Sequence, residues 1–268
     1  MDKWQTRRIL ILGTTYPSHS QKYTETVCTG GLFEDTLQMC RLHPVPQRYL
    51  EAQHRVHKFQ WITARVMKHD TDPRPESYRI DPQSIEPQEK LSDHDERRRL
   101  LEESPNLCRS VEELFEHYEG HGMSLGIVVP ESILDCSVEM RRESEREAWQ
   151  NKERARALQE RLFGEKPKPL AFPEAQFFVR WKCQEPDCPT HNMSILQWGI
   201  HELYRKYNDP EVAKEKVLQK MRQELNEGEK DIFLFLGNFR TIMYNFGLMD
   251  SYSAPARAAN KDQFSLFR

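Results

Sequence analysis

The chain has 268 residues and a formal net charge of −3, with 37% hydrophobic and 30% charged residues. This composition is typical of a polar protein that is large enough to bury a core without disulfide bonds. It excludes a polycationic surface as the means of binding nucleic acid. Contact with nucleic acid would need a local basic surface, or a partner that is already on DNA.

The sequence indicates neither a membrane span nor a secreted fold. The longest apolar run, residues 232–236, is far shorter than the roughly 20 residues that a bilayer requires, and the N-terminal MDKWQTRR has no apolar signal region behind its charges. Six cysteines are scattered without the dense spacing of a secreted scaffold, which favours reduced thiols or metal ligands. We therefore expect a cytoplasmic protein.

Residues 1–134 are expected to form a strand-rich domain. Four segments have the continuous or alternating apolar pattern of strands: RILILG, LQMCRLHPV, KFQWITARVMK and MSLGIVVP. Between them lie long loops rich in Pro, Ser, Thr and Gly, including TTYPSHSQKYTETVCTGG and HDTDPRPESYRIDP. Loops of this length usually carry function.

Residues 135–172 are expected to be a charged helix followed by a linker. The stretch 137–163 contains neither Gly nor Pro, is rich in strong helix formers, and is followed by Gly164. Its apolar residues are sparse, so it is either a solvated connecting helix or a surface for a protein partner.

Residues 173–250 are expected to form a small α/β module, which makes the whole chain an α+β protein. AQFFVRWKC alternates like a strand, and Ser194 with Gln197 has the spacing of a capping box that opens a helix. A second helix is predicted to begin with Asp209 as cap and Pro210 at its first position. DIFLFLG is predicted to be a buried strand, and residues 251–268 a flexible tail.

Cys183, Cys188 and His191 fall within nine residues of the stretch WKCQEPDCPTHN. Two thiolates and an imidazole on one turn are ligands that Zn²⁺ selects. The alternative is two unpaired surface cysteines and a loop histidine. For a zinc site, the fourth ligand is His201, Cys28, Cys40 or a water molecule. A protein ligand would make the site structural, whereas a water molecule would make it an open Lewis acid.

Cys28 lies just before Gly30 and Gly31, where the backbone can approach a ligand closely. There it could act as a nucleophile with His19 or His43 as base, or be no more than a small residue at the edge of a turn.

The N-terminal part also carries a candidate nucleic-acid face. Arg74 stands between two prolines that restrict its backbone, an arrangement that suits a phosphate or a carboxylate. Other cations are interleaved with Tyr49, Phe59 and Trp61, as on nucleic-acid-binding surfaces: Arg41, Arg48, Arg65 and Lys68. Acidic residues are nearly as frequent there, so a mixed solvated surface is the alternative.

Two resemblances extend these predictions. TVCTGG, RLHPVPQR, DPRPESYR and the Cys/His cluster together resemble an uncharacterised prokaryotic family, which implies no activity. Gln263-Phe264-Ser265-Leu266-Phe267 resembles the pentapeptide Gln-Leu-Ser/Asp-Leu-Phe with which DNA-handling proteins bind the bacterial sliding clamp. The resemblance implies that Gln263 hydrogen-bonds at one subsite and that Leu266 and Phe267 fill an apolar pocket. Phe264 replaces the usual leucine.

Together these observations predict an accessory protein of bacterial DNA metabolism, in repair, modification, mobile-element maintenance or defence. The tail would recruit it to the clamp, where it would contact nucleic acid, and zinc would stabilise it. One alternative is an enzyme that acts on nucleotides or nucleic acid through Cys28 or an open zinc. The other is an interaction scaffold without chemistry.

Overall fold

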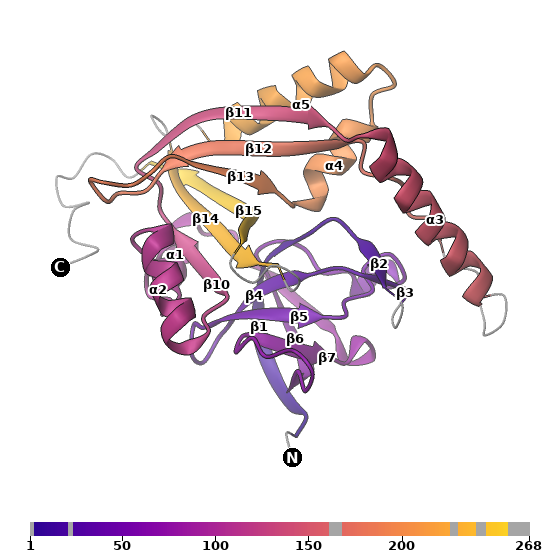
Figure 1. Ribbon diagram of the computed structural model, residues 1–268. Coiled ribbons are helices and arrows are strands. Elements are labelled where there is room, and N and C mark those ends of the chain that lie inside the picture. The colour runs from indigo at the N-terminus through magenta and orange to yellow at the C-terminus, as the bar shows by residue number, and fades with distance from the viewer. Residues whose placement is uncertain (1–2, 21–23, 161–167, 226–229, 240–244, 257–268) are drawn as a thin grey trace.

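The structure is a computed structural model that describes residues 3–20, 24–160, 168–225, 230–239 and 245–256 (Figure 1). The described residues form both strands and α-helices, which confirms the α+β class. None of the helices in these ranges is long and apolar enough to cross a membrane.

The N-terminal part is a small β-barrel. Its six strands pair in the order β1-β4-β5-β7-β6-β8, and β1 pairs with β6 as well, so five strands close into a ring with β8 attached to β6. The strands are β1 (Gln5–Thr14), β4 (Thr29–Phe33), β5 (Met39–His43), β6 (Gln60–Lys68), β7 (Ser77–Ile80) and β8 (Glu86–Lys90). A separate hairpin joins β2 (Ser18–Ser20) to β3 (Thr24–Thr26), and two 3₁₀ turns are η1 (Ala52–His54) and η2 (Pro82–Ser84).

The remainder of the chain builds a seven-stranded sheet. Its order is β11-β12-β13-β15-β14-β10-β9, mostly antiparallel. The strands are β9 (Leu107–Cys108), β10 (Leu125–Val128), β11 (Ser132–Met140), β12 (Ala175–Lys182), β13 (His191–Ile195), β14 (Lys230–Asn238) and β15 (Phe246–Pro255). The helices are α1 (His94–Glu102), α2 (Val111–His121), α3 (Glu143–Glu160), α4 (Trp198–Arg205) and α5 (Pro210–Glu224).

The sheet lies between helices and barrel. On one face, the sheet residues Ile232 and Leu234 share a core with Val217 and Met221 of α5. On the other face, Phe233 and Phe235 share a second core with Leu10 and other barrel residues. Figure 1 shows α4 and α5 over the face that is turned away from the barrel.

Strand β1 is buried on both faces, because it lies between the barrel interior and the seven-stranded sheet. Ile9 and Ile11 point into the barrel, whereas Leu10 and Leu12 pack against the seven-stranded sheet. The unbroken apolar run RILILG is therefore the sequence of a strand with two covered faces.

Several predicted elements are confirmed. RILILG lies inside β1, the other three runs in the N-terminal part contain β5, β6 and β10, and AQFFVRWKC and DIFLFLG correspond to β12 and β14. Asp209 caps α5 by accepting bonds from the N–H groups of Glu211 and Val212, at 2.8 and 3.3 Å.

Two boundaries differ from the prediction. The helix predicted at 137–163 begins only at Glu143, because residues 132–140 pair with β12 as strand β11. Ser194 does not cap a helix, since it lies in β13 opposite Phe178, and α4 begins later with Gln197 at its N-cap.

The domain limits differ too. We predicted an N-terminal domain that ends at 134, but β9, β10 and β11 belong to the seven-stranded sheet, so the change of sheet falls between β8 and β9. The predicted tail from 251 begins inside β15, which pairs with β14 as far as Pro255.

Candidate metal centre

Four potential metal ligands meet beside the β12–β13 hairpin. Cys183 directly follows β12, His191 opens β13, and Cys188 lies in the turn between them. The register of the hairpin sets Trp181 opposite His191, which brings the two ends of the turn together. The fourth group, the carboxylate of Glu112, comes from the first turn of α2, more than 70 positions earlier in the chain.

The ligand atoms are close enough to surround one ion, all lying within 4.8 Å of one another. His191 Nε2 is 3.2 Å from the sulfur atoms of both Cys183 and Cys188. Glu112 carboxylate oxygens lie 3.6 Å from His191 Nε2 and 3.9 Å from Cys183 Sγ. A tetrahedron built on ordinary Zn–S, Zn–N and Zn–O bond lengths has edges of about 3.3–3.8 Å, so these separations suit a four-coordinate ion.

The protonation states of Cys183 and His191 decide whether the cluster can hold a cation. Burial raises the pKa of the Cys183 thiol, although the N–H of Val111 donates to its sulfur at 3.4 Å and opposes that rise. Burial also lowers the pKa of His191, against the charge of Glu112, so the imidazole is held in the neutral form that ligates metals. A bound divalent ion would keep the thiols deprotonated.

His201, our candidate for the fourth ligand, lies elsewhere. It is buried on α4 between the rings of Tyr16 and Phe177, whose centroids are 4.7 and 5.0 Å away. The fourth place beside the cysteines is taken by Glu112 instead. Cys40 is buried inside the barrel, among residues such as Ile9 and Phe33.

Cys28 is half-buried at the start of β4, where its backbone bonds with Thr15. Its sulfur lies within electrostatic reach of the Arg41 guanidinium. His19, one of the two bases that we considered, bonds Glu153 of α3 through Nε2 at 2.9 Å. The ring of the other, His43, lies 6.2 Å from that of His69.

Two of the arginines predicted to face nucleic acid are buried. Arg41 is 5% exposed and Arg74 is 8% exposed. Arg41 donates to the hydroxyl of Ser124 at 2.9 Å. Arg74 bonds both carboxylate oxygens of Asp72, at 2.6 and 2.9 Å, and the backbone oxygen of Asn238 at 3.1 Å. The prediction for these two residues is therefore wrong, because their charges are used between barrel and sheet.

The other three predicted cations lie nearer the surface. Arg65 is 3.6 Å from the carboxylate of Asp81, and Lys68 lies 4.9 Å from the ring centroid of Tyr78. Arg48 donates to the backbone oxygen of Pro169 at 2.6 Å. The tail residues Gln263, Phe264, Leu266 and Phe267 lie outside the described residues.

Sequence reasoning missed Glu112. Its only local signal is the spacing of Ser110 and Glu113, which is that of a capping box, and the Ser110 hydroxyl does accept the N–H of Glu113 at 3.0 Å. The spacing predicts that Glu112 lies in the first turn of a helix. It does not predict that this helix lies beside the β12–β13 hairpin.

Comparison with family models places the chain in a family. The model described as Domain of unknown function (DUF8757) matches residues 108–268, more than half of the chain, so the protein belongs to this family. A second model, Domain of unknown function (DUF8758), matches residues 5–103. The two matches meet where the structure passes from the barrel to the seven-stranded sheet. No curated protein matched the chain.

Proposed function

We propose that the protein is a zinc-stabilised accessory factor of bacterial DNA metabolism that works in the cytoplasm and reaches DNA through the sliding clamp. The observation that carries the clamp association is the pentapeptide 263–267. The burial of Arg41 and Arg74 supports delivery by a partner, because it leaves three of the five predicted nucleic-acid-binding cations near the surface of a chain whose net charge is −3.

The geometry of the cluster supports a structural role for the zinc ion. Glu112 supplies a fourth protein ligand atom beside the two thiols and the imidazole, and closed four-ligand sites are the structural kind. The ion would join the N-terminal turn of α2 to the β12–β13 hairpin, two segments that are far apart in sequence. This arrangement favours a stabilising ion over the open catalytic zinc of the enzyme hypothesis.

Metal analysis tests the zinc site. We expect one zinc per chain in the purified protein, loss of that zinc in Cys183→Ser, and a lower melting temperature after chelation. Glu112→Gln should weaken zinc binding by roughly 10–100-fold or more. That range is typical for loss of a residue that only hydrogen-bonds to a metal ligand, and Glu112 would itself be a ligand.

Matched controls come from the same chain. Cys28→Ser removes a half-buried thiol outside the cluster, and Glu116→Gln alters an exposed carboxylate one turn further along α2. Both should keep the full zinc content. A wild-type protein without stoichiometric metal, or equal losses in the controls, contradicts the zinc assignment.

The clamp association is tested by calorimetry with purified clamp. A peptide of residues 258–268 and the full chain should both bind, and Leu266→Ala with Phe267→Ala should abolish binding, because this pair would supply most of the buried apolar area. Phe264→Leu, which restores the more usual residue, should tighten it. Full-length protein that gives no heat with the clamp overturns the proposal.

A further inference from the structure

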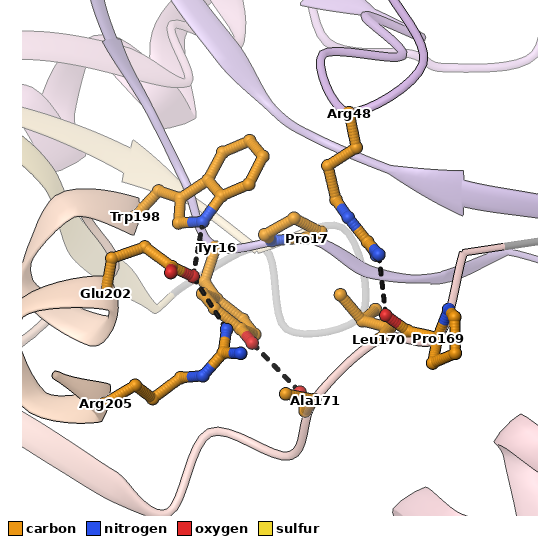
Figure 2. A pocket seen from close by; sticks show the side chains of 9 residues that line it. All are labelled: Tyr16, Pro17, Arg48, Pro169, Leu170, Ala171, Trp198, Glu202 and Arg205. Carbon is orange, nitrogen blue, oxygen red and sulfur yellow. Dashed lines mark hydrogen bonds and ion pairs between the residues drawn. The ribbon is translucent and has the colours of Figure 1, made fainter.

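A cavity of about 390 Å³ lies where the barrel, the linker and α4 meet (Figure 2). Its walls come from the residues after β1, from the loop that follows β5, from residues 169–171 and from α4. The volume falls in the range of small-molecule sites, about 300–1,000 Å³. A ligand bound here would touch both family-model regions of the chain.

On one wall, the indole of Trp198 and the guanidinium of Arg205 both donate a hydrogen bond to Glu202. Oε1 of Glu202 accepts a bond from Trp198 Nε1 at 3.0 Å and one from Arg205 Nη1 at 2.8 Å. The carboxylate thereby fixes both side chains on one face of α4, and the Arg205 charge offsets that of Glu202. An arginine carries five N–H donors, so this contact leaves most of them for another acceptor.

Arg48 is a second cation, on the opposite wall of the cavity. Figure 2 shows Arg48 and Arg205 approaching the cavity from opposite sides, with Tyr16 between them. Burial raises the pKa of Tyr16, and the charges of Arg205 and Arg48 both oppose that rise, so both cations act on the same hydroxyl. That hydroxyl donates to the backbone oxygen of Ala171 at 2.9 Å, which fixes its place in the wall.

The remaining lining is apolar. Pro17, Leu170 and the indole of Trp198 line the cavity as well, so it offers apolar side chains beside two guanidinium groups. Planar guanidinium groups match the oxygens of a phosphate, and an indole face suits a base. A simple inorganic anion would leave the apolar part of the cavity unused.

We propose that this cavity binds one nucleotide unit, with the phosphate between Arg48 and Arg205 and the base against Trp198. The unit is a free mononucleotide or the 5′-phosphorylated end of a single strand, which offer the same chemistry. The site is independent of the proposed clamp association, because none of its residues belongs to the tail.

Equilibrium dialysis of the full chain at about 0.1 M salt tests the site with four probes: deoxyadenosine monophosphate, deoxyadenosine, inorganic phosphate, and a 5′-phosphorylated oligodeoxyadenylate. The mononucleotide should bind more tightly than the nucleoside or phosphate. Arg205→Ala should weaken binding about tenfold or more, because it removes charge-assisted bonds. Trp198→Ala should weaken it about fivefold or more through lost stacking.

Controls separate the site from general attraction. Lys206→Ala removes an exposed cation next to Arg205 that does not line the cavity, and Trp4→Ala removes an exposed indole elsewhere. Both should bind like the wild type. Binding of the oligonucleotide alone supports the site with a strand end as its ligand.

Three results overturn the proposal. They are no binding of either phosphorylated nucleotide probe, phosphate binding that gains nothing from the base, and equal losses in Lys206→Ala and Arg205→Ala. A tail-deleted protein should lose clamp binding but bind the nucleotide probes like the full chain. Failure of one proposal is therefore distinguishable from failure of the other.

Discussion

At the scale of single residues, neighbours decide what a polar side chain does. Arg74 was expected to point outward because prolines flank it, but Asp72 two positions earlier bonds its guanidinium on both oxygens. A buried carboxylate needs a buried cation. The stretch DPRPES therefore carries its own counter-ion, and its arginine turns inward.

His201 gives the protein a defined sensitivity to acid. Burial, with a smaller contribution from Arg141, lowers the pKa of His201 from 6.5 to about 4. The folded state then binds fewer protons than the unfolded state at intermediate pH, so the stabilisation is present above about pH 6.5 and is lost as pH falls through about 4. At about 1.4 kcal/mol for each pH unit, the loss approaches about 3 kcal/mol.

Urea denaturation between pH 7 and pH 4 measures this effect. His201→Asn, which cannot titrate, should flatten the decline in unfolding free energy, whereas His54→Asn at an exposed position should keep it. Both variants keep the four residues of the candidate metal centre, so any release of a bound metal at low pH would be common to them. Parallel pH profiles for the wild type and His201→Asn would contradict the assignment.

At the scale of elements, the local sequence pattern predicted which segments are strands better than it predicted which strands pair with one another. Runs such as RILILG and DIFLFLG are recognisable because a strand covered on both faces needs apolar residues at every position. The helix at 143–160 was predicted from composition, but its start was not, because SVEM lacks a local stop signal and becomes strand through its pairing with Phe177 and Phe178. Tertiary pairing overrides propensity there.

The candidate metal centre also combines residues that the local sequence predicts with one that it does not. Cys183, Cys188 and His191 could be predicted because nine consecutive residues bring them together on one turn. Glu112 could not, because its distance from the turn is set by the packing of α2 against the sheet, where Val111 and Leu114 join the common core. A local motif can thus predict a site without predicting all of its ligands.

At the scale of the whole molecule, buried polar contacts join the barrel to the sheet. Arg74 reaches the oxygen of Asn238, and Glu76 accepts bonds from the backbone N–H and the hydroxyl of Ser124, at 2.9 and 2.7 Å. Lys58 pairs with the buried carboxylate of Asp250 at 2.6 Å. With the apolar core that contains Leu10 and Phe233, these contacts should make the two regions unfold together.

Arg74→Ala tests this coupling. Burial alone would raise the pKa of Asp72, but the bonds and charge of Arg74 outweigh it and hold that pKa well below its ordinary value. Removal of Arg74 leaves a buried carboxylate without its cation, which typically costs about 3–5 kcal/mol. Arg79→Ala is the matched control, because Arg79 pairs with the exposed Asp70 at 3.2 Å and such pairs contribute at most about 1 kcal/mol.

Urea unfolding followed by both tryptophan fluorescence and far-ultraviolet circular dichroism distinguishes the outcomes. The wild type should give one transition with coincident midpoints, since neither region can separate without exposing the shared apolar core. Arg74→Ala should lower that midpoint well beyond the change in Arg79→Ala and keep the transition single, because the apolar contacts remain. Two separate transitions in the wild type would show that barrel and sheet are independent, and equal losses in the two variants would show that Arg74 contributes no more than a surface pair.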